Sequence, residues 1–295
     1  MRWKDKGRSR NLEDRRGAVA SGGRRRKSTI GAAGIIILLI AAALGKTGLL
    51  SDLGLSSSGS AGGTSANGSS GTASSAPQAN SPKEEKAIRF LSFLIDDMEE
   101  SWTKKLSGSP TPYQAPVLVV FRDGVDSACG FSSSATGPFY CPADRKLYLD
   151  LSFFRDLAVR FSAAGDFAQA YVVGHEVGHH LQTLTGISPR MRRAQKRNPS
   201  RKNELSVLLE LQADCYAGIW ANDAARRRLL EVGDLEEALR AATAIGDDTL
   251  QRKSSGKVRP ESWTHGSSAQ RKKWFRIGYD QGSIAACDTF AGEQI

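Results

Sequence analysis

The residues with the clearest chemical meaning lie in one short stretch, His175-Glu176-Val177-Gly178-His179. On a helix, histidines at positions i and i+4 project from one face about one turn apart. That spacing lets both rings share a Zn²⁺ ion at about 2.0 to 2.1 Å. Glu176 would lie beside the metal, where its carboxylate can take a proton from water. The stretch therefore predicts zinc-assisted hydrolysis, and a chance match to the pattern is the weaker alternative.

A catalytic zinc normally has three protein ligands, so the two histidines need a partner. Glu210 and Asp214 stand at i and i+4 in a later predicted helix. One carboxylate can bind the metal while the other accepts the free ring N–H of a ligand histidine. A solvated acidic face is the alternative, but Leu208, Leu209 and Leu211 surround Glu210, and a carboxylate among leucines needs a partner. We predict Glu210 as the third ligand and Asp214 as a partner of a histidine.

Two further histidines need separate interpretations. His180 follows the motif by one residue, so it points about 100° away from His179 and off the metal face. We expect it to pack or to support the site. His265 lies in a Gly- and Ser-rich loop at a helix start and could donate to a developing oxyanion. A structural hydrogen bond within that loop is the stronger interpretation of His265.

The four cysteines, Cys129, Cys141, Cys215 and Cys287, form an even set without the close Cys-x2-Cys spacing of a metal site. Three pairings are possible. We expect Cys129 with Cys141, closing a short local loop, and Cys215 with Cys287, fastening the C-terminal segment to a helix. Such pairs fit an oxidising compartment.

The first third of the chain differs in composition from the rest. Residues 1–27 hold eleven Lys or Arg against three acids, a net charge of +8 out of +10 for the chain. We expect a basic cytoplasmic tail there, a transmembrane anchor at 28–50 with the basic side inside, and a Ser/Gly/Ala-rich linker at 51–82. A cleaved signal peptide is the alternative to the anchor. Because the charge is local, it does not indicate a nucleic-acid partner.

Residues 83–295 then remain as one domain. Apolar periodicity predicts a first helix at 83–106, strands at 117–122 and 146–153, and a helical remainder. The later helices are expected at 153–164, 167–185, 202–228, 235–245 and 267–280, with Ser267 and Gln270 forming a capping box at the start of the last. The fold class predicted is α+β, mainly α, with a small sheet.

These motifs resemble a known family. The segment from Gly137 to Asp144, the segment from Tyr148 to Phe154, HEVGHHLQ, ELQAD and the segment from Thr264 to Arg271 occur in the order found in the bacterial neutral zinc metallopeptidases. HExxH followed by ExxxD is also similar to the gluzincin group. The resemblance implies a zincin-like, membrane-anchored peptidase with one Zn²⁺ per chain.

The implied mechanism uses zinc held by His175, His179 and Glu210, with Glu176 moving the proton. The expected partners are a peptide or protein substrate and the lipid bilayer through residues 28–50, with no nucleic acid. The implied location is the cell membrane, as a single-pass protein with a cytoplasmic N-terminus and a periplasmic or extracellular domain. The rival function is a membrane-anchored scaffold or binding protein that keeps the zinc fold without hydrolysis; the retained Glu176 favours the enzyme.

Overall fold

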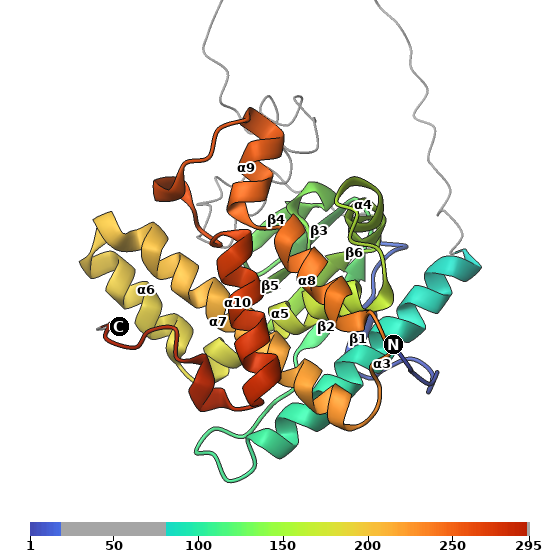
Figure 1. Ribbon diagram of the computed structural model, residues 1–295. Coiled ribbons are helices and arrows are strands. Elements are labelled where there is room, and N and C mark those ends of the chain that lie inside the picture. Colours follow the sequence, from blue (N-terminus) through green and yellow to red (C-terminus); the bar gives the residue numbers. More distant parts are fainter. Residues whose placement is uncertain (19–80, 294–295) are drawn as a thin grey trace, which may run out of the picture.

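A computed structural model describes residues 1–18 and 81–293 (Figure 1). A four-stranded sheet has the order β1-β2-β6-β5. Its strands are β1 (Leu12–Asp14), β2 (Val117–Phe121), β6 (Lys146–Asp150) and β5 (Phe139–Cys141). β1, β2 and β6 are parallel, and β5 runs antiparallel to β6 at one edge. A separate hairpin joins β3 (Gly124–Ser127) to β4 (Gly130–Ser133).

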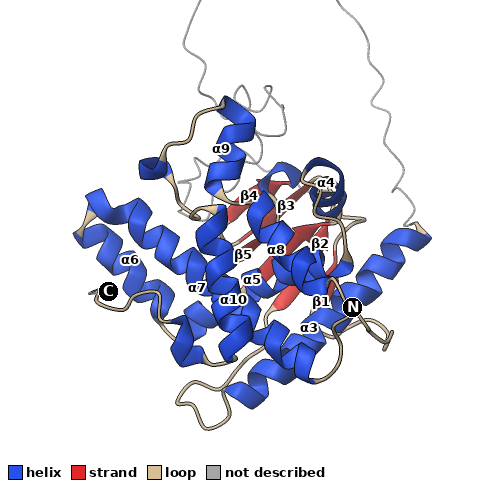
Figure 2. Ribbon diagram, in the orientation of Figure 1, coloured by secondary structure: helices blue, strands red, loops and turns tan. Residues whose placement is uncertain are grey.

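Helices make up most of the rest, as Figure 2 shows. They are α3 (Pro82–Lys105), α4 (Ser152–Arg160), α5 (Asp166–Leu184), α6 (Ile187–Arg197), α7 (Lys202–Arg226), α8 (Asp234–Ala244), α9 (Asp247–Ser255) and α10 (Ser268–Gln281). The predicted mainly helical α+β class is therefore confirmed. No helix in the described ranges is both long and apolar enough to cross a membrane. The predicted anchor at 28–50 and nearly all of the predicted linker lie outside those ranges.

The first long helix starts where its capping chemistry places it. Ser81 accepts from the backbone N–H of Glu84, and the Glu84 side chain accepts from the backbone N–H of Ser81. Pro82 fits the first turn because its missing N–H would have no partner there. Ser81 and Pro82 thus begin helix α3, and the predicted linker boundary at residue 82 is corrected to residue 80 or earlier. The predicted capping box of α10, Ser267 with Gln270, is confirmed.

Residues 1–18 belong to the folded domain, which corrects the prediction that residues 1–27 form a separate basic tail. Leu12, Glu13 and Asp14 pair in parallel with β2. The basic side chains then meet carboxylates of α3: Arg16, whose side chain is 1% exposed, donates to Glu85 at 2.6 Å, and Arg10 donates to Glu99 at 2.8 Å. The tail interpretation failed because it treated local positive charge as solvated and ignored the acidic face of α3.

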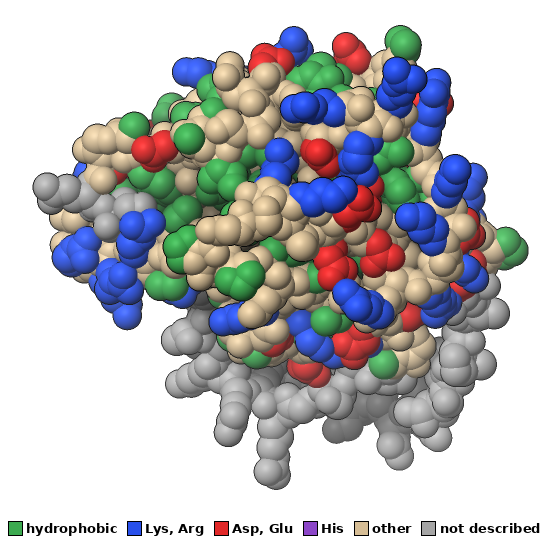
Figure 3. Space-filling view, turned by 90° about the horizontal axis from the view of Figure 1, so that it is seen from below, with side chains coloured by type: hydrophobic (Ala, Val, Ile, Leu, Met, Phe, Trp, Pro, Cys, Tyr) green, Lys and Arg blue, Asp and Glu red, His purple; other side chains and the backbone are tan. Residues whose placement is uncertain are grey.

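The surface shows the same mixing of charge. On the face drawn in Figure 3, Lys and Arg side chains lie interspersed with Asp and Glu over much of the area. Such mixing lets cations and carboxylates neutralise each other locally. The +10 net charge of the chain is therefore not gathered into one basic surface on this face.

Helices α7 and α10 pack closely because each has a glycine that lies against the backbone of the other helix. A Cβ on Gly218 would lie 2.1 Å from the Phe275 carbonyl oxygen, and one on Gly278 would lie 1.9 Å from that of Cys215. Any side chain at either position would force the helices apart. This approach brings α10 and the loop before it against the helix that carries Glu210 and Asp214.

Candidate metal centre

Three predicted ligands converge between α5 and α7. The Nε2 atom of His175 lies 3.2 Å from Glu210 Oε2, and the Nε2 atom of His179 lies 3.5 Å from Glu210 Oε1. Donor atoms of all three residues lie within 4.8 Å of one another. Two imidazole nitrogens and a carboxylate oxygen are the donor set of known catalytic zinc sites. The residues present therefore fit a zinc ion.

The outer nitrogen of each histidine has its own acceptor. His175 Nδ1 lies 2.8 Å from Asp214 Oδ1, as predicted for Asp214, and His179 Nδ1 lies 2.9 Å from Gln182 Oε1. Each acceptor holds a proton on Nδ1 and leaves the Nε2 lone pair free to bind a cation. The arrangement thus selects the tautomer that a metal ligand needs.

Glu176 stands beside the ligands with a different environment. It is 6% exposed, and within the described chain its carboxylate has no hydrogen-bond partner. Burial raises the pKa of Glu176, although the neighbouring His179 and His175 oppose this. A buried carboxylate without a protein partner is available to bind and deprotonate a small polar molecule such as water.

The electrostatics of the site favour positive charge at the point of convergence. Burial alone would lower the pKa of His175, but Asp214 and Glu210 more than reverse this and raise it to about 10. Burial would raise the pKa of Glu210, yet the positive charge of neighbouring histidines holds it well below its ordinary value. A metal cation bound between these groups would supply the positive charge that the carboxylates favour, and the histidines could then stay neutral.

Asp214 is the centre of a buried hydrogen-bond network. The network lies on the Nδ1 side of His175, whereas Nε2 of that ring faces Glu210. Tyr171 donates to Asp214 Oδ1 at 2.6 Å, and Arg271 donates to both oxygens at 2.8 and 2.9 Å. Asp214 is fully buried, and Arg271 is 3% exposed. Burial would raise the pKa of Asp214, but Arg271 and His175 lower it to about 2. This charge-assisted bidentate pair keeps Asp214 ionised and fixed behind His175.

His265 lies in the loop between α9 and α10, which packs against α7. A Cβ on Gly266 would lie 3.1 Å from Val207 Cγ1, and the charge of His265 is among the causes of the low pKa of Glu210. Asp247 orients the loop: its Oδ1 lies 3.1 Å from His265 Nδ1. Its Oδ2 accepts the backbone N–H groups of Thr264, His265 and Gly266 at 2.7 to 3.1 Å. Nδ1 of His265 is thereby engaged, as expected for a structural role, and Nε2 is left for other contacts.

His180 points off the metal face, as predicted. Its Nε2 lies 2.6 Å from the Gln114 carbonyl oxygen and its Nδ1 lies 3.1 Å from Tyr140 Oη. Burial lowers the pKa of His180 to about 4, so the ring is neutral at pH 7. These contacts join the zinc helix to edge strand β5. Asp144, by contrast, accepts from Ala128, Lys146 and Tyr148 and serves its own loop.

The cysteine pairing is confirmed on both counts. Cys129 pairs with Cys141, and Cys215 pairs with Cys287. The first bond fastens the β3–β4 hairpin to edge strand β5. The second fastens the segment after α10 to α7 at Cys215, the residue that follows Asp214. Of the two bonds, the second therefore joins the helix that carries Glu210 and Asp214.

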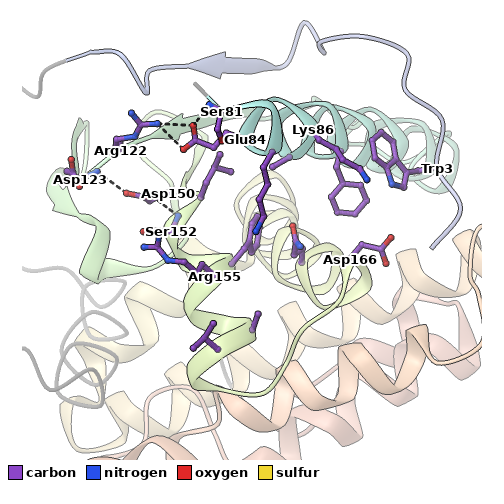
Figure 4. A pocket seen from close by; sticks show the side chains of 18 residues that line it. Trp3, Ser81, Glu84, Lys86, Arg122, Asp123, Asp150, Ser152, Arg155 and Asp166 are labelled. Atoms are coloured by element: carbon purple, nitrogen blue, oxygen red, sulfur yellow. Dashed lines mark hydrogen bonds and ion pairs between the residues drawn. The ribbon is translucent and has the colours of Figure 1, made fainter. Parts of the chain in front are cut away.

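A separate cavity of about 840 Å³ opens at the start of α3, and its lining includes Trp3, Glu84, Asp150, Arg155 and Asp166. Figure 4 shows these side chains coming from the N-terminal segment, α3, β6, α4 and α5. Two of its lining residues form an ion pair, since Arg122 donates to Glu84 at 2.9 Å. None of the predicted zinc ligands lines this cavity, so it is distinct from the metal centre.

Sequence reasoning missed three residues that support the site: Gln182, Asp247 and Arg271. Arg271 ends the segment from Thr264 that carries part of the family resemblance, but nothing in its spacing indicates Asp214 as its partner. Gln182 follows His179 at i+3, which is the one local signal that could have placed it beside the ligand. Asp247 is one of two adjacent acids at a helix start and reads there as an ordinary N-terminal residue.

Comparison with known proteins agrees with this geometry. The family described as "Putative neutral zinc metallopeptidase" matches residues 1–290. The uncharacterised protein YpfJ of Escherichia coli is 49% identical over 211 residues, covering 71% of this chain and 74% of its own. The uncharacterised protein Mb2605 of Mycobacterium bovis is 41% identical over 211 residues, covering 68% and 69%. No solved structure matches the chain. The chain belongs to the neutral zinc metallopeptidase family.

Proposed function

We propose that this protein is a zinc-dependent peptidase that hydrolyses peptide bonds in a protein or peptide substrate. The observation that supports this best is the convergence of His175, His179 and Glu210 beside a buried carboxylate, Glu176, for which the described residues provide no hydrogen-bond partner. A purely structural zinc site usually fills its coordination with protein groups and has no use for such a base.

The roles follow from the geometry. His175, His179 and Glu210 would hold the metal, and zinc supplies Lewis acidity that polarises a peptide carbonyl and makes water acidic. Glu176 accepts the proton of the attacking water and delivers it to the leaving amine nitrogen. His265, fixed through Nδ1, would donate from Nε2 to the oxygen that becomes negative. Asp214 and Asp247 keep their histidines in the required tautomers.

Edge strand β5 is the element suited to hold an extended substrate. The strand predicted at 146–153 is not available for this role, because β6 lies between β2 and β5 and both its sides are paired. Among the described strands, β5 pairs with β6 alone. A peptide that added to this sheet would therefore do so along β5. Tyr140 of β5 contacts His180 of the helix that carries His175 and His179, which supports this choice of strand.

Zinc content and casein hydrolysis test the proposal together. The full chain should be used, because residues 1–18 are part of the domain. Glu176→Gln should keep zinc and lower the hydrolysis rate by about 10²- to 10⁴-fold, the usual contribution of a general base. Glu236→Gln, an exposed change on α8, is the matched control and should leave both unchanged.

The outcomes separate the proposal from its rival. Zinc in both proteins with cleavage only by the native chain supports the peptidase and the role of Glu176. Zinc without any cleavage of casein or of an unbiased peptide library favours the non-catalytic scaffold. Absence of zinc from the native chain would refute the metal centre itself. Bilayer contact through residues 28–50 stays a prediction from the sequence.

A further inference from the structure

The amide of Gln182 connects both sides of the metal centre. Gln182 is fully buried and lies three residues after His179 on α5. Its Oε1 accepts from His179 Nδ1 at 2.9 Å, while its Nε2 donates to the Leu209 carbonyl oxygen at 2.7 Å. Leu209 immediately precedes Glu210 on α7. One side chain therefore contacts one ligand directly and the backbone beside another.

The orientation of this amide follows from its partners. A carbonyl oxygen can only accept, so the NH₂ group of Gln182 must face Leu209, and the amide oxygen must face His179. The oxygen can only accept, so His179 carries its proton on Nδ1. The NH₂ group makes a second bond to Gln212 Oε1 at 3.2 Å. Each polar atom of Gln182 thus has a partner that fixes its direction.

The same chain of contacts reaches the C-terminal segment. Gln212 is 4% exposed and donates through Nε2 to the Cys287 carbonyl oxygen at 3.0 Å. Cys287 is held there by its disulfide to Cys215, which stands one helical turn after Gln212 on α7. Thr289 adds a bond to the Leu208 carbonyl oxygen at 2.7 Å. The segment after α10 therefore packs on the turn of α7 that carries Glu210.

We propose that Gln182 and Gln212 are positioning residues for His179, and that the Cys215–Cys287 disulfide supports zinc retention by holding the Cys287 carbonyl on Gln212. The proposal rests on the metal centre of the proposed function but not on peptide hydrolysis. Loss of either amide leaves buried polar atoms without partners and lets the His179 ring turn. Zinc should then leave more readily even though every ligand is present.

Zinc release to a chromophoric chelator tests this directly. Gln182→Met should speed release by about 10- to 100-fold, the range for loss of a group that orients a ligand. Gln212→Met and the double change Cys215→Ala with Cys287→Ala should each speed release by a smaller factor. Gln195→Met on α6 removes two hydrogen bonds to Lys202 and Ser206 away from the site and is the matched control. Cys129→Ala with Cys141→Ala is the control for loss of a disulfide.

A spectroscopic measurement separates positioning from general weakening. With Co²⁺ in place of Zn²⁺, Gln182→Met should shift the visible bands that report ligand geometry, whereas Gln195→Met should leave them unchanged. When Gln182→Met is combined with the Cys215 and Cys287 changes, zinc release should speed up by less than the product of the separate fold-increases. All of these changes act through one chain of contacts.

Several results would overturn the proposal. Release at the native rate from Gln182→Met would do so, as would equal acceleration in the Gln195 and Cys129–Cys141 controls. If Gln182→Met does not fold, Gln212→Met decides by the same criteria. Zinc retention that follows the predicted order, in a protein that cleaves no peptide, would support this proposal while refuting the peptidase. A native chain that binds no zinc would refute both.

Discussion

Gly178 lies directly against Ala213, where a Cβ on the glycine would meet the Ala213 Cα and carbonyl oxygen at 2.9 Å. A glycine within a helix costs stability relative to alanine, and close packing against α7 is the reason for it at this position. Because α5 and α7 touch at this point, Glu210 of α7 comes within 3.5 Å of both ligand histidines. The glycine sets the width of the metal centre.

Gly178→Ala should therefore damage the site without changing any ligand. Crowding in a packed interior costs about 1 to 3 kcal/mol, partly offset by about 1 kcal/mol from the better helix propensity of Ala. We expect net destabilisation in urea unfolding and zinc release at least about tenfold faster, as for loss of a supporting contact. Gly174→Ala on the same helix, whose Cβ would lie 3.4 Å from Ala217 Cβ, should be close to neutral. Equal behaviour of the two variants would argue against this account.

The Asp214 and Arg271 pair should behave as a unit. Arg271→Met or Asp214→Asn alone leaves a buried group without its partner and should cost about 3 to 5 kcal/mol in unfolding experiments. The double variant should cost less than the sum, because neither charge is then stranded. Asp223→Asn breaks a partly exposed pair with Arg227 on the same helix and should cost under about 1 kcal/mol. Additive costs at Asp214 and Arg271 would contradict the pairing.

The role of His265 can be separated from that of the ligands. His265→Ala should lower kcat by about 10²- to 10³-fold, the usual loss of an oxyanion donor, while zinc content stays at one per chain. Asp247→Asn should lower kcat less and should also loosen the loop, since a weaker acceptor then faces three backbone N–H groups. If His265→Ala keeps the native kcat, His265 is not the oxyanion donor and has only a structural role in its loop.

Docking of the N-terminal segment should depend on acid pH. Hydrogen bonds from Arg15, Arg16 and Arg8 lower the pKa values of Glu13, Asp14 and Glu85. Since these pKa values are lower in the folded state, their stabilisation is present above about pH 4 to 5 and is lost as the pH falls through the folded values. Hydrogen exchange of residues 1–18 should therefore rise below about pH 4, before exchange of α5 and α7. Simultaneous exchange of all three segments would contradict this.

The metal ligands were predictable because their chemistry is local. His175, His179 and Glu176 lie within one helical turn, and Asp214 follows Glu210 at a spacing that the helix period interprets directly. Asp247 and Gln212 were not predictable, because their partners lie 18 and 75 residues away and only the fold brings them together. Short-range spacing therefore identified the candidate ligands but not the groups that orient them.

The same distinction applies to the fold. α3 and α5 carry regular apolar periodicity or strong capping and were predicted close to their observed bounds. β1 was missed, because three residues, Leu12 to Asp14, become a strand only through β2, more than 100 positions later. β5 was not among the predicted strands, since Phe139 to Cys141 follow a Gly- and Ser-rich stretch and are held by β6 and a disulfide. α6 has few apolar residues and forms against α5 and α7.

The parallel pairing of β1 with β2 bears on membrane topology. Neighbouring strands lie about 4.8 Å apart, whereas the hydrocarbon core of a bilayer is about 30 Å thick. No bilayer can therefore separate residues 1–18 from the body formed by residues 81–293. The location of the domain and the anchor at residues 28–50 stay predictions from the sequence. Whichever compartment allows the two disulfides to persist also holds the first eighteen residues of the chain.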